Sequence, residues 1–127
     1  MEAVIDTSVY VASMIEDDVN HREARRLLES IETWITPIMV VHELTWFFRR
    51  EIYAQTAKAV ESIIHHARSR VVSHILDDVI YGLRDPRNYN DRVILHVSKR
   101  LETPLATFDN SLRKLALSEG VEVLCEC

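Results

Sequence analysis

Four acidic side chains, Asp6, Glu43, Asp91 and Asp109, occur where a plain surface acid is not expected. Asp6 and Asp109 each end a short apolar run directly before a predicted helix, and Glu43 and Asp91 lie in predicted helices. A helix turns by about 100° per residue, so that Glu43 and Asp91 fall on the sides that carry apolar side chains. An ionised carboxylate in such surroundings is unfavourable unless it is paired, hydrogen-bonded or bound to a cation.

Glu43 is the clearest of the four. In the predicted helix after Pro37 it lies about 40° around the axis from Met39, inside an apolar arc. That arc contains Met39, Val40, Leu44, Trp46, Phe47 and Phe48, and the opposite arc carries His42, Thr45 and Arg49. Arg50 is on the same side as Glu43, so an ion pair between them is the structural alternative to a functional role.

The other three acids each have a structural alternative as well. Asp91 stands in the first turn of its predicted helix, where the helix dipole and N-capping favour a carboxylate. Asp6 and Asp109 precede helices and have the same alternative. A shared site is favoured because Asp6 and Asp109 each follow a predicted strand. The carboxyl ends of parallel strands meet at one edge of a sheet, where ligands bind.

Four carboxylates in one pocket cannot all stay ionised without a compensating charge. Mg²⁺ or Mn²⁺ supplies that charge and prefers oxygen ligands, whereas zinc takes His or Cys at defined spacing. We assign the six histidines to surface or core positions, and Cys125 and Cys127 fit neither a disulfide framework nor paired zinc motifs. Only two glycines occur, which excludes glycine-rich phosphate-binding loops.

Apolar periodicity and capping signals predict strands alternating with helices. The predicted strands are 3–5, 34–36, 70–74, 105–108 and 121–124. The predicted helices are 8–15, 21–31, 38–50, 55–67, 76–83, 91–101 and a last one from a cap at 109–111 to near Gly120, with 84–90 as a loop. This order predicts an α/β fold, a three-layer α/β/α sandwich with a mostly parallel central sheet.

The 127 residues suffice for one domain with a single core, and we take residues 1–127 as that domain. A net charge of −5 and 47% hydrophobic residues are typical of a globular protein. No apolar run approaches the roughly 18 residues of a membrane span, and Met1 leads into the first strand without a signal-peptide pattern. We therefore expect a reducing, cytoplasmic setting without a membrane.

Four short stretches together make the chain resemble a known family. They are 4–8 (VIDTS), 41–44 (VHEL), 90–95 (NDRVIL) and 107–113 (TFDNSLR). In this order they resemble the PIN-domain nucleases, and among these the short toxins of the VapC type, over essentially the whole chain.

The resemblance implies a site as well as a fold. Its acidic quartet would be Asp6, Glu43, Asp91 and Asp109, with Ser8 and Thr107 as supporting hydroxyls. Many relatives carry further acids where this chain has Asn90 and Asn110, so the number of bound metals stays open.

The implied activity is metal-dependent RNA hydrolysis. Water activated by Mg²⁺ or Mn²⁺ would attack the phosphodiester in line with the leaving 3′-oxygen and leave 5′-phosphate and 3′-hydroxyl ends. We expect Asp6, Asp91 and Asp109 as direct ligands. Glu43 would bind a second metal or act through water as a general base.

Basic side chains near Asp91 are candidate RNA contacts. They are Arg87, Arg92, Lys99 and Arg100, with Arg84 close by. Arg92, Lys99 and Arg100 are predicted, together with His96, to form an exposed basic helix face that meets phosphates, with a merely solvated face as the alternative. The four site acids account for most of the acidic excess, so the net charge does not oppose RNA binding.

The expected partners follow from the resemblance. Toxins of this type are held inactive by a small VapB-type antitoxin, whose tail places a basic side chain near the acids, and Arg pairs well with carboxylates. A homodimer is also expected. Trp46, Phe47 and Phe48 offer more aromatic surface than one core-facing side of a helix needs, so part of it is expected to serve self-association. Core packing is the expected role of Phe47.

Other functions are compatible with parts of the pattern. The same chemistry would serve a stand-alone RNA-processing PIN nuclease, and a non-catalytic RNA-binding or scaffolding relative would keep the fold. A phosphoaspartate phosphatase is disfavoured, because Ser8 stands where its second Asp would be. A receiver domain is disfavoured because Lys114, the late lysine, lies in a predicted helix.

Overall fold

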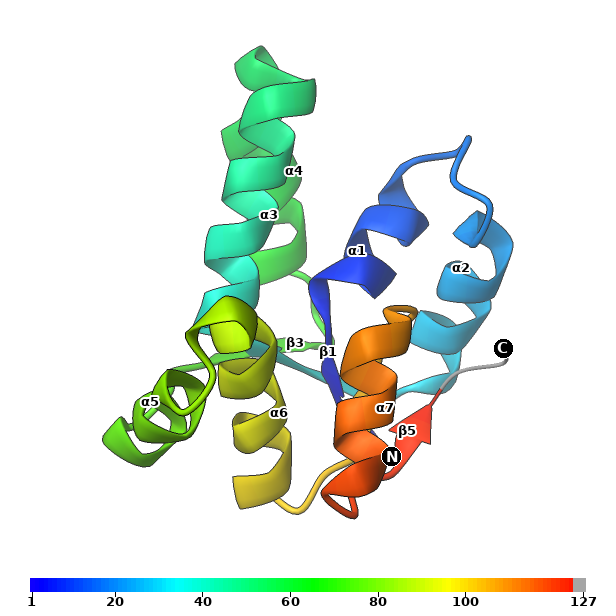
Figure 1. Cartoon of the computed structure of the whole chain (residues 1–127). Helices are drawn as coiled ribbons and strands as arrows, with labels where there is room; N and C mark the ends of the chain where they lie inside the picture. The colour runs from blue at the N-terminus through cyan, green and yellow to red at the C-terminus, as the bar shows by residue number, and fades with distance from the viewer. Residues whose placement is uncertain (125–127) are drawn as a thin grey trace.

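The computed structural model describes residues 1–124, and a parallel sheet lies at its centre (Figure 1). Its strands are β1 (Glu2–Ile5), β2 (Thr33–Pro37), β3 (Ser69–Val72), β4 (Leu105–Ala106) and β5 (Val123–Leu124). They form one five-stranded sheet in the order β3-β2-β1-β4-β5. Cys125 and Cys127 lie outside the described residues.

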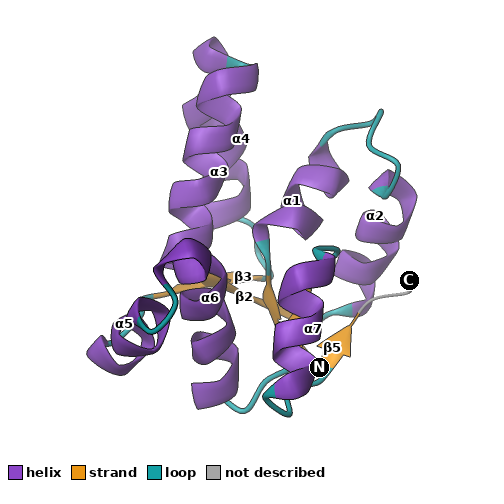
Figure 2. Cartoon of the chain, in the orientation of Figure 1, coloured by secondary structure: helices purple, strands orange, loops and turns teal. Residues whose placement is uncertain are grey.

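Seven α-helices in the described part of the chain flank this sheet (Figure 2). They are α1 (Thr7–Met14), α2 (His21–Ser30), α3 (Ile38–Glu51), α4 (Thr56–Ile64), α5 (Leu76–Leu83), α6 (Tyr89–Arg100) and α7 (Asn110–Ser118). Two single-turn 3-10 helices, η1 (Tyr53–Gln55) and η2 (Pro86–Asn88), precede α4 and α6. The predicted α/β/α sandwich is confirmed, and its sheet is parallel throughout.

The first strand is central because its residues can be buried on both faces. Ala3, Val4 and Ile5 have no exposed surface, and β1 pairs with β2 on one side and with β4 on the other. A continuous apolar run of this kind is typical of an interior strand in a parallel sheet.

The bounds of three predicted elements differ from the structure in ways that matter for the site. Strands predicted at 105–108 and 121–124 pair over only two residues each, β4 and β5. Past β4, the backbone of Phe108 and Asp109 donates to side-chain hydroxyls instead of to a neighbouring strand. The predicted loop 84–90 contains η2 and the start of α6, so that Asp91 is the third residue of its helix.

The helix face predicted to be exposed and basic packs against α5. His96 Nδ1 lies 2.6 Å from Oδ1 of the fully buried Asp78, and Arg100 donates to Oδ2 of the same carboxylate at 2.9 Å. Arg92 lies over the ring of Tyr81, 4.0 Å from its centre, and donates to its carbonyl. The prediction of a solvent-exposed face is wrong for these residues, because the buried carboxylate of Asp78 needs hydrogen-bond partners and Tyr81 packs on Arg92.

Gly82 lets α5 approach α6 closely. A Cβ at this position would lie 2.7 Å from Cδ1 of Tyr89 and 2.9 Å from Cγ2 of Val93. Overpacking of this kind costs about 1–3 kcal/mol, more than the roughly 1 kcal/mol that alanine gains in helix propensity. We expect Gly82→Ala to lower the midpoint of urea unfolding; an unchanged or higher midpoint would show that Tyr89 moves aside at no cost.

Candidate active site

The strand order places two of the four acids at one point of the sheet. Successive connections lead from β1 to β2 and β3 on one side, and to β4 and β5 on the other. Between β1 and β4 the order therefore reverses, and in open parallel sheets ligands bind beyond the strand ends at such a point. Asp6 directly follows β1 and Asp109 comes three residues after β4.

Asp6 is buried and held by two hydroxyl groups. Its side chain is 4% exposed, and its Oδ2 accepts hydrogen bonds from Ser8 Oγ at 2.7 Å and Thr107 Oγ1 at 2.8 Å. Asp6 occupies the N-cap position of α1, but its side chain caps no backbone N–H. Burial raises the pKa of Asp6 and nearby Glu43 raises it further, whereas the bonds from Ser8 and Thr107 oppose the shift. The structure thus places both predicted supporting hydroxyls on Asp6.

Asp109 has the capping role that was its structural alternative. Its Oδ1 accepts a hydrogen bond from the backbone N–H of Leu112 at 2.9 Å, and the residue is exposed. This cap fixes the carboxylate at the start of α7, beside the end of β1. Capping and a role in the site are therefore compatible here.

Glu43 is half-buried and is held by residues that the sequence analysis did not select. Thr7 Oγ1 donates to its Oε1 at 2.6 Å, and Asn90 Nδ2 donates to its Oε2 at 3.3 Å. Within residues 1–124, Glu43 has no cation within 4.0 Å, so the alternative ion pair with Arg50 is not formed. The only sequence signal for Thr7 and Asn90 was that each lies next to a predicted site acid.

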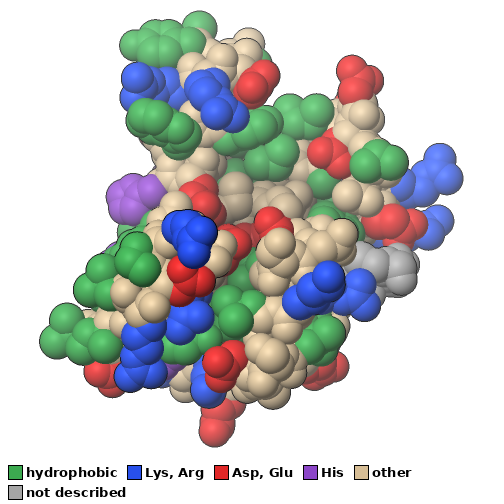
Figure 3. All heavy atoms as spheres, in the orientation of Figure 1, with side chains coloured by type: hydrophobic (Ala, Val, Ile, Leu, Met, Phe, Trp, Pro, Cys, Tyr) green, Lys and Arg blue, Asp and Glu red, His purple; other side chains and the backbone are tan. Residues whose placement is uncertain are grey.

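The pKa of Asp91 indicates that the four carboxylates are close to one another. Burial, together with the charges of Asp6, Asp109 and Glu43, raises the pKa of Asp91 to about 7. The N-cap position of α6 is Asn88, so Asp91 does not have the capping role considered for it. In Figure 3 acidic side chains gather in a hollow at the centre of this face.

The donor set fits a hard divalent cation. All four groups are carboxylates, which Mg²⁺ and Mn²⁺ prefer, and a cation would relieve the repulsion that raises the pKa of Asp91. In the described residues, no three Asp, Glu, His or Cys side chains are yet close enough together to hold a metal ion. The carboxylates lie near one another, but their side chains would have to move closer together to bind an ion.

The raised pKa of Asp91 predicts a pH-dependent stability in EDTA. The folded protein takes up this proton near pH 7, whereas the unfolded chain does so near the ordinary value of 3.8. Between these values the folded state binds more protons, so this group's contribution to the free energy of unfolding falls as pH rises. We expect Asp91→Asn to stabilise the protein in urea unfolding most at about pH 8, and to have little effect at about pH 4. Equal effects at both pH values would contradict the shift.

The four basic residues predicted to contact RNA lie in different surroundings. Arg87 is exposed and lines a small hollow together with Asn90 and Asp91. Lys99 pairs with Glu119 at 3.1 Å, and Arg92 and Arg100 have the α5 contacts described above. Arg87 and Arg92 each line a hollow with Asp91 and form no ion pair in the described residues, but Arg92 is engaged with Tyr81.

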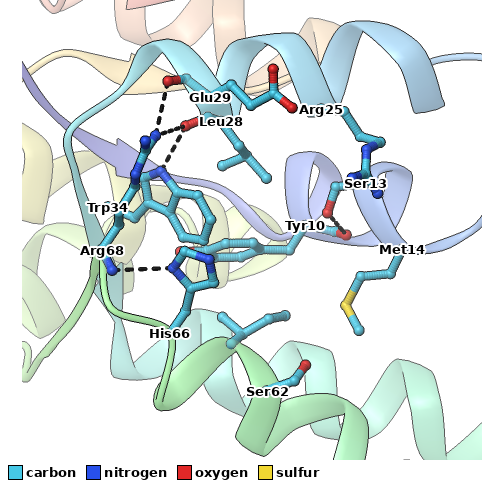
Figure 4. Close-up of a pocket in the computed structure, with 11 residues that line it drawn as sticks. Tyr10, Ser13, Met14, Arg25, Leu28, Glu29, Trp34, Ser62, His66 and Arg68 are labelled. Atoms are coloured by element: carbon cyan, nitrogen blue, oxygen red, sulfur yellow. Dashed lines mark hydrogen bonds between the residues drawn. The ribbon is translucent and has the colours of Figure 1, made fainter.

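A second hollow lies among α1, α2 and α4, and none of the four acids lines it (Figure 4). There Trp34 stacks on His66 with ring centres 4.1 Å apart, and Arg68 donates to the carbonyls of Leu28 and Glu29 at the end of α2. The contacts of Arg68 satisfy backbone carbonyls at the end of α2. We therefore assign the polar groups of this hollow a structural role.

Solved structures similar to this one share its fold. The VapC20 toxin of Mycobacterium tuberculosis, described as cleaving the sarcin–ricin loop, is 21% identical with a TM-score of 0.78, over 89% of this chain and 94% of that one. VapBC2 of Rickettsia felis, bound to a promoter DNA fragment, is 13% identical with a TM-score of 0.69, over 98% of both chains. A toxin–antitoxin complex of Klebsiella pneumoniae is 16% identical with a TM-score of 0.69, over 97% of this chain and 96% of that one.

The sequence itself gives the family. No curated protein sequence matches the chain, and no helix in the described part is long and apolar enough to cross a membrane. The sequence pattern of the PIN domain matches residues 3–117, from the strand before Asp6 to the helix after Asp109. The chain therefore belongs to the PIN domain family.

Proposed function

We propose that the chain is a single-domain ribonuclease that depends on Mg²⁺ or Mn²⁺ and hydrolyses phosphodiester bonds of RNA. The observation that carries the proposal is the convergence of the carboxylates that follow β1, lie in α3 and α6, and precede α7; burial and these neighbouring charges together raise the pKa of Asp91 to about 7. Such a cluster does not help the chain to fold, because the carboxylates repel one another. The described toxin activity of the similar VapC20 structure supports RNA as the substrate.

In this proposal Asp6, Asp91 and Asp109 hold the metal. When bound, the ion supplies Lewis acidity, which lowers the pKa of water and offsets negative charge on the attacked phosphate. Ser8 and Thr107 fix the orientation of Asp6 by donating to one of its oxygens.

To Glu43 we assign the transfer of a proton or the completion of the ligand set. Its two oxygens are oriented by Thr7 and Asn90, which both donate to it. A carboxylate held in one orientation is suited to accept a proton from the attacking water.

Cleavage of RNA by the purified protein tests the proposed function. We expect single-stranded RNA to be cleaved with Mg²⁺ or Mn²⁺ into products with 5′-phosphate ends, and to remain intact in EDTA. Glu43→Gln keeps the side-chain volume and removes the charge, so it should strongly reduce the rate. Absence of cleavage by the native protein with every divalent ion and RNA tested would favour the non-catalytic alternative.

Metal binding should also stabilise the fold. Millimolar Mn²⁺ or Mg²⁺ is expected to raise the Tm by several degrees, because a ligand that binds only the folded state shifts the unfolding equilibrium. Asp91→Asn should remove most of this increase. An unchanged Tm for the native protein, with unchanged NMR shifts of the acidic residues, would contradict the shared carboxylate site.

We further propose that the chain is the toxin of a toxin–antitoxin pair, inhibited by a small VapB-type antitoxin. Support comes from the similar structures of a VapBC pair and a toxin–antitoxin complex. A basic side chain of the partner would pair with the acids and compete with the metal. Expression of the chain alone should arrest growth of its host, and co-expression of a small neighbouring gene product should relieve the arrest.

A homodimer is the oligomeric state we propose. The aromatic run predicted for self-association is divided in the structure, since Phe48 is buried, Phe47 packs on the core and Trp46 is exposed. Leu76, Ile80 and Leu83 of α5 are 71%, 44% and 59% exposed and lie on one side of the helix, so they offer an alternative apolar surface. Light scattering of the native protein should give the mass of a dimer, and Leu83→Glu should reduce it.

A further inference from the structure

A hollow on the surface of α3 opens directly beside Glu43. Its volume is about 530 Å³, and the indole of Trp46 forms part of its wall. The remaining lining side chains are Thr7, His42, Phe47, Arg50 and Asn90. The hollow therefore joins an acid of the site to an aromatic ring and a guanidinium group.

The spacing along α3 puts these three groups on one face of the helix. Trp46 follows Glu43 by three residues and Arg50 follows it by seven, which are positions on the same side of an α-helix. With a rise of about 1.5 Å per residue, Arg50 lies about 10 Å along the axis from Glu43, and Trp46 lies between them. A ligand that extends from Glu43 to Arg50 must pass the indole.

Trp46 is exposed in a way that the core does not explain. Its side chain is 60% exposed, whereas the other tryptophan, Trp34, is 8% exposed and packs in the core. The guanidinium of Arg49 lies 4.8 Å from the centre of the Trp46 ring. Arg49 does not line the hollow, whereas Trp46 does and keeps most of its surface exposed despite this contact.

The charges beside the indole suit an anionic ligand. Within residues 1–124, neither Arg49 nor Arg50 has a carboxylate within 4.0 Å. Aromatic rings combined with arginine are the usual means by which proteins bind unpaired bases and the phosphates between them. The rim of the hollow carries the polar side chains of His42, Arg50 and Asn90. It therefore suits an anionic ligand better than the apolar face of a helix from a partner protein.

We propose that this hollow is a subsite for one unpaired nucleotide of the RNA substrate, whose base stacks on Trp46 and whose phosphate contacts Arg50. The inference rests on the proposed ribonuclease function, because it places this nucleotide next to Glu43. Bases within a duplex already stack on one another and cannot reach the indole without being extruded. The subsite therefore selects RNA that is single-stranded beside the cleaved bond.

Binding measured without metal tests the subsite separately from cleavage. In EDTA, a short fluorescein-labelled oligouridylate is expected to show a rise in anisotropy on binding and to quench the fluorescence of Trp46, and its perfect duplex and an abasic chain of equal length are expected to bind more weakly; the anisotropy gives the Kd of every variant. Trp46→Ala should raise the Kd for oligouridylate about tenfold, whereas Trp46→Phe retains a stacking ring and much of the affinity. Tyr53→Ala is the matched control, because Tyr53 is 78% exposed nearby and does not line the hollow.

The role of Arg50 has its own readout. Arg50→Gln should weaken binding and reduce the slope of log Kd against log salt by about one, as expected for one lost phosphate contact. Arg22→Gln, which removes an exposed arginine of α2, should leave both quantities unchanged. Equal effects of the two substitutions would show non-specific attraction and overturn the assignment of Arg50.

Three results would overturn the subsite. They are an unchanged Kd in Trp46→Ala, an equal loss in Tyr53→Ala, and a lower mass of Trp46→Ala by light scattering, which would assign the indole to a contact between protein chains. Failure of the proposed function looks different: the native protein would then bind oligouridylate through Trp46 but not cleave RNA with metal. If the native protein cleaves RNA and Trp46→Ala has the native KM, the ribonuclease stands and the subsite is wrong.

Discussion

Replacement of Asp91 by asparagine is expected to reduce metal-dependent RNA cleavage by at least about a hundredfold, since loss of a charged ligand removes several kcal/mol of transition-state stabilisation. Asparagine has nearly the same volume and preserves the packing at the start of α6. The fold should therefore survive, as circular dichroism and the unfolding transition would show.

The same loss is expected for Asp6→Asn and Asp109→Asn, for different structural reasons. Asparagine at position 6 can still accept the hydrogen bonds of Ser8 and Thr107. Asparagine at position 109 is as good an N-cap as aspartate, so α7 is retained. In both variants the carboxylate charge is what disappears.

Asp85→Asn is the matched control for these three variants. Asp85 lines a hollow together with Asp91, but its side chain accepts from Asn88 and is not among the groups that raise the pKa of Asp91. Its cleavage rate should stay close to that of the native protein. Equal losses in Asp85→Asn and Asp91→Asn would mean that the third acid of the site has been misplaced.

Alanine at Asp78 is expected to lower the free energy of unfolding by about 2–3 kcal/mol, because it leaves the partly buried Arg100 and His96 without their hydrogen-bond partner. Burial alone would raise the pKa of Asp78, but the hydrogen bonds from Arg100 and His96 hold it below its ordinary value. The ionised carboxylate thus joins α5 to α6, the helix that carries Asp91. Urea unfolding at neutral pH measures the loss.

Asp77→Ala is the appropriate comparison for this variant. Asp77 stands in the same helical turn and is exposed, so its removal costs no more than the few tenths to 1 kcal/mol of a helix-dipole interaction. If the two variants unfold at the same urea concentration, the contact between Asp78 and Arg100 does not stabilise the packing of α5 on α6.

The α/β class, the order of the elements and the four candidate acids could all be derived from the sequence. Local rules determine these features, since a strand such as 3–5 must be apolar on both faces and an acid before a helix is visible as a motif. The anomaly of Glu43 was also visible, because helical periodicity alone shows that it leaves the polar face. The ends of β4 and β5 were less predictable, since strand length depends on the neighbouring strand.

Contacts between distant parts of the chain were decided by the tertiary structure. Periodicity showed which side of α6 is polar, but not that Asp78 of α5 would cover it and engage Arg100. It placed Trp46 on the apolar arc of α3, although the packing of residues 1–124 leaves the indole exposed. Nor could it show that Asn90 orients Glu43 from 47 residues away. The sequence by itself determined which residues could do the chemistry, whereas the packing of helices decided which charges meet, because burial and pairing depend on partners far away in the chain.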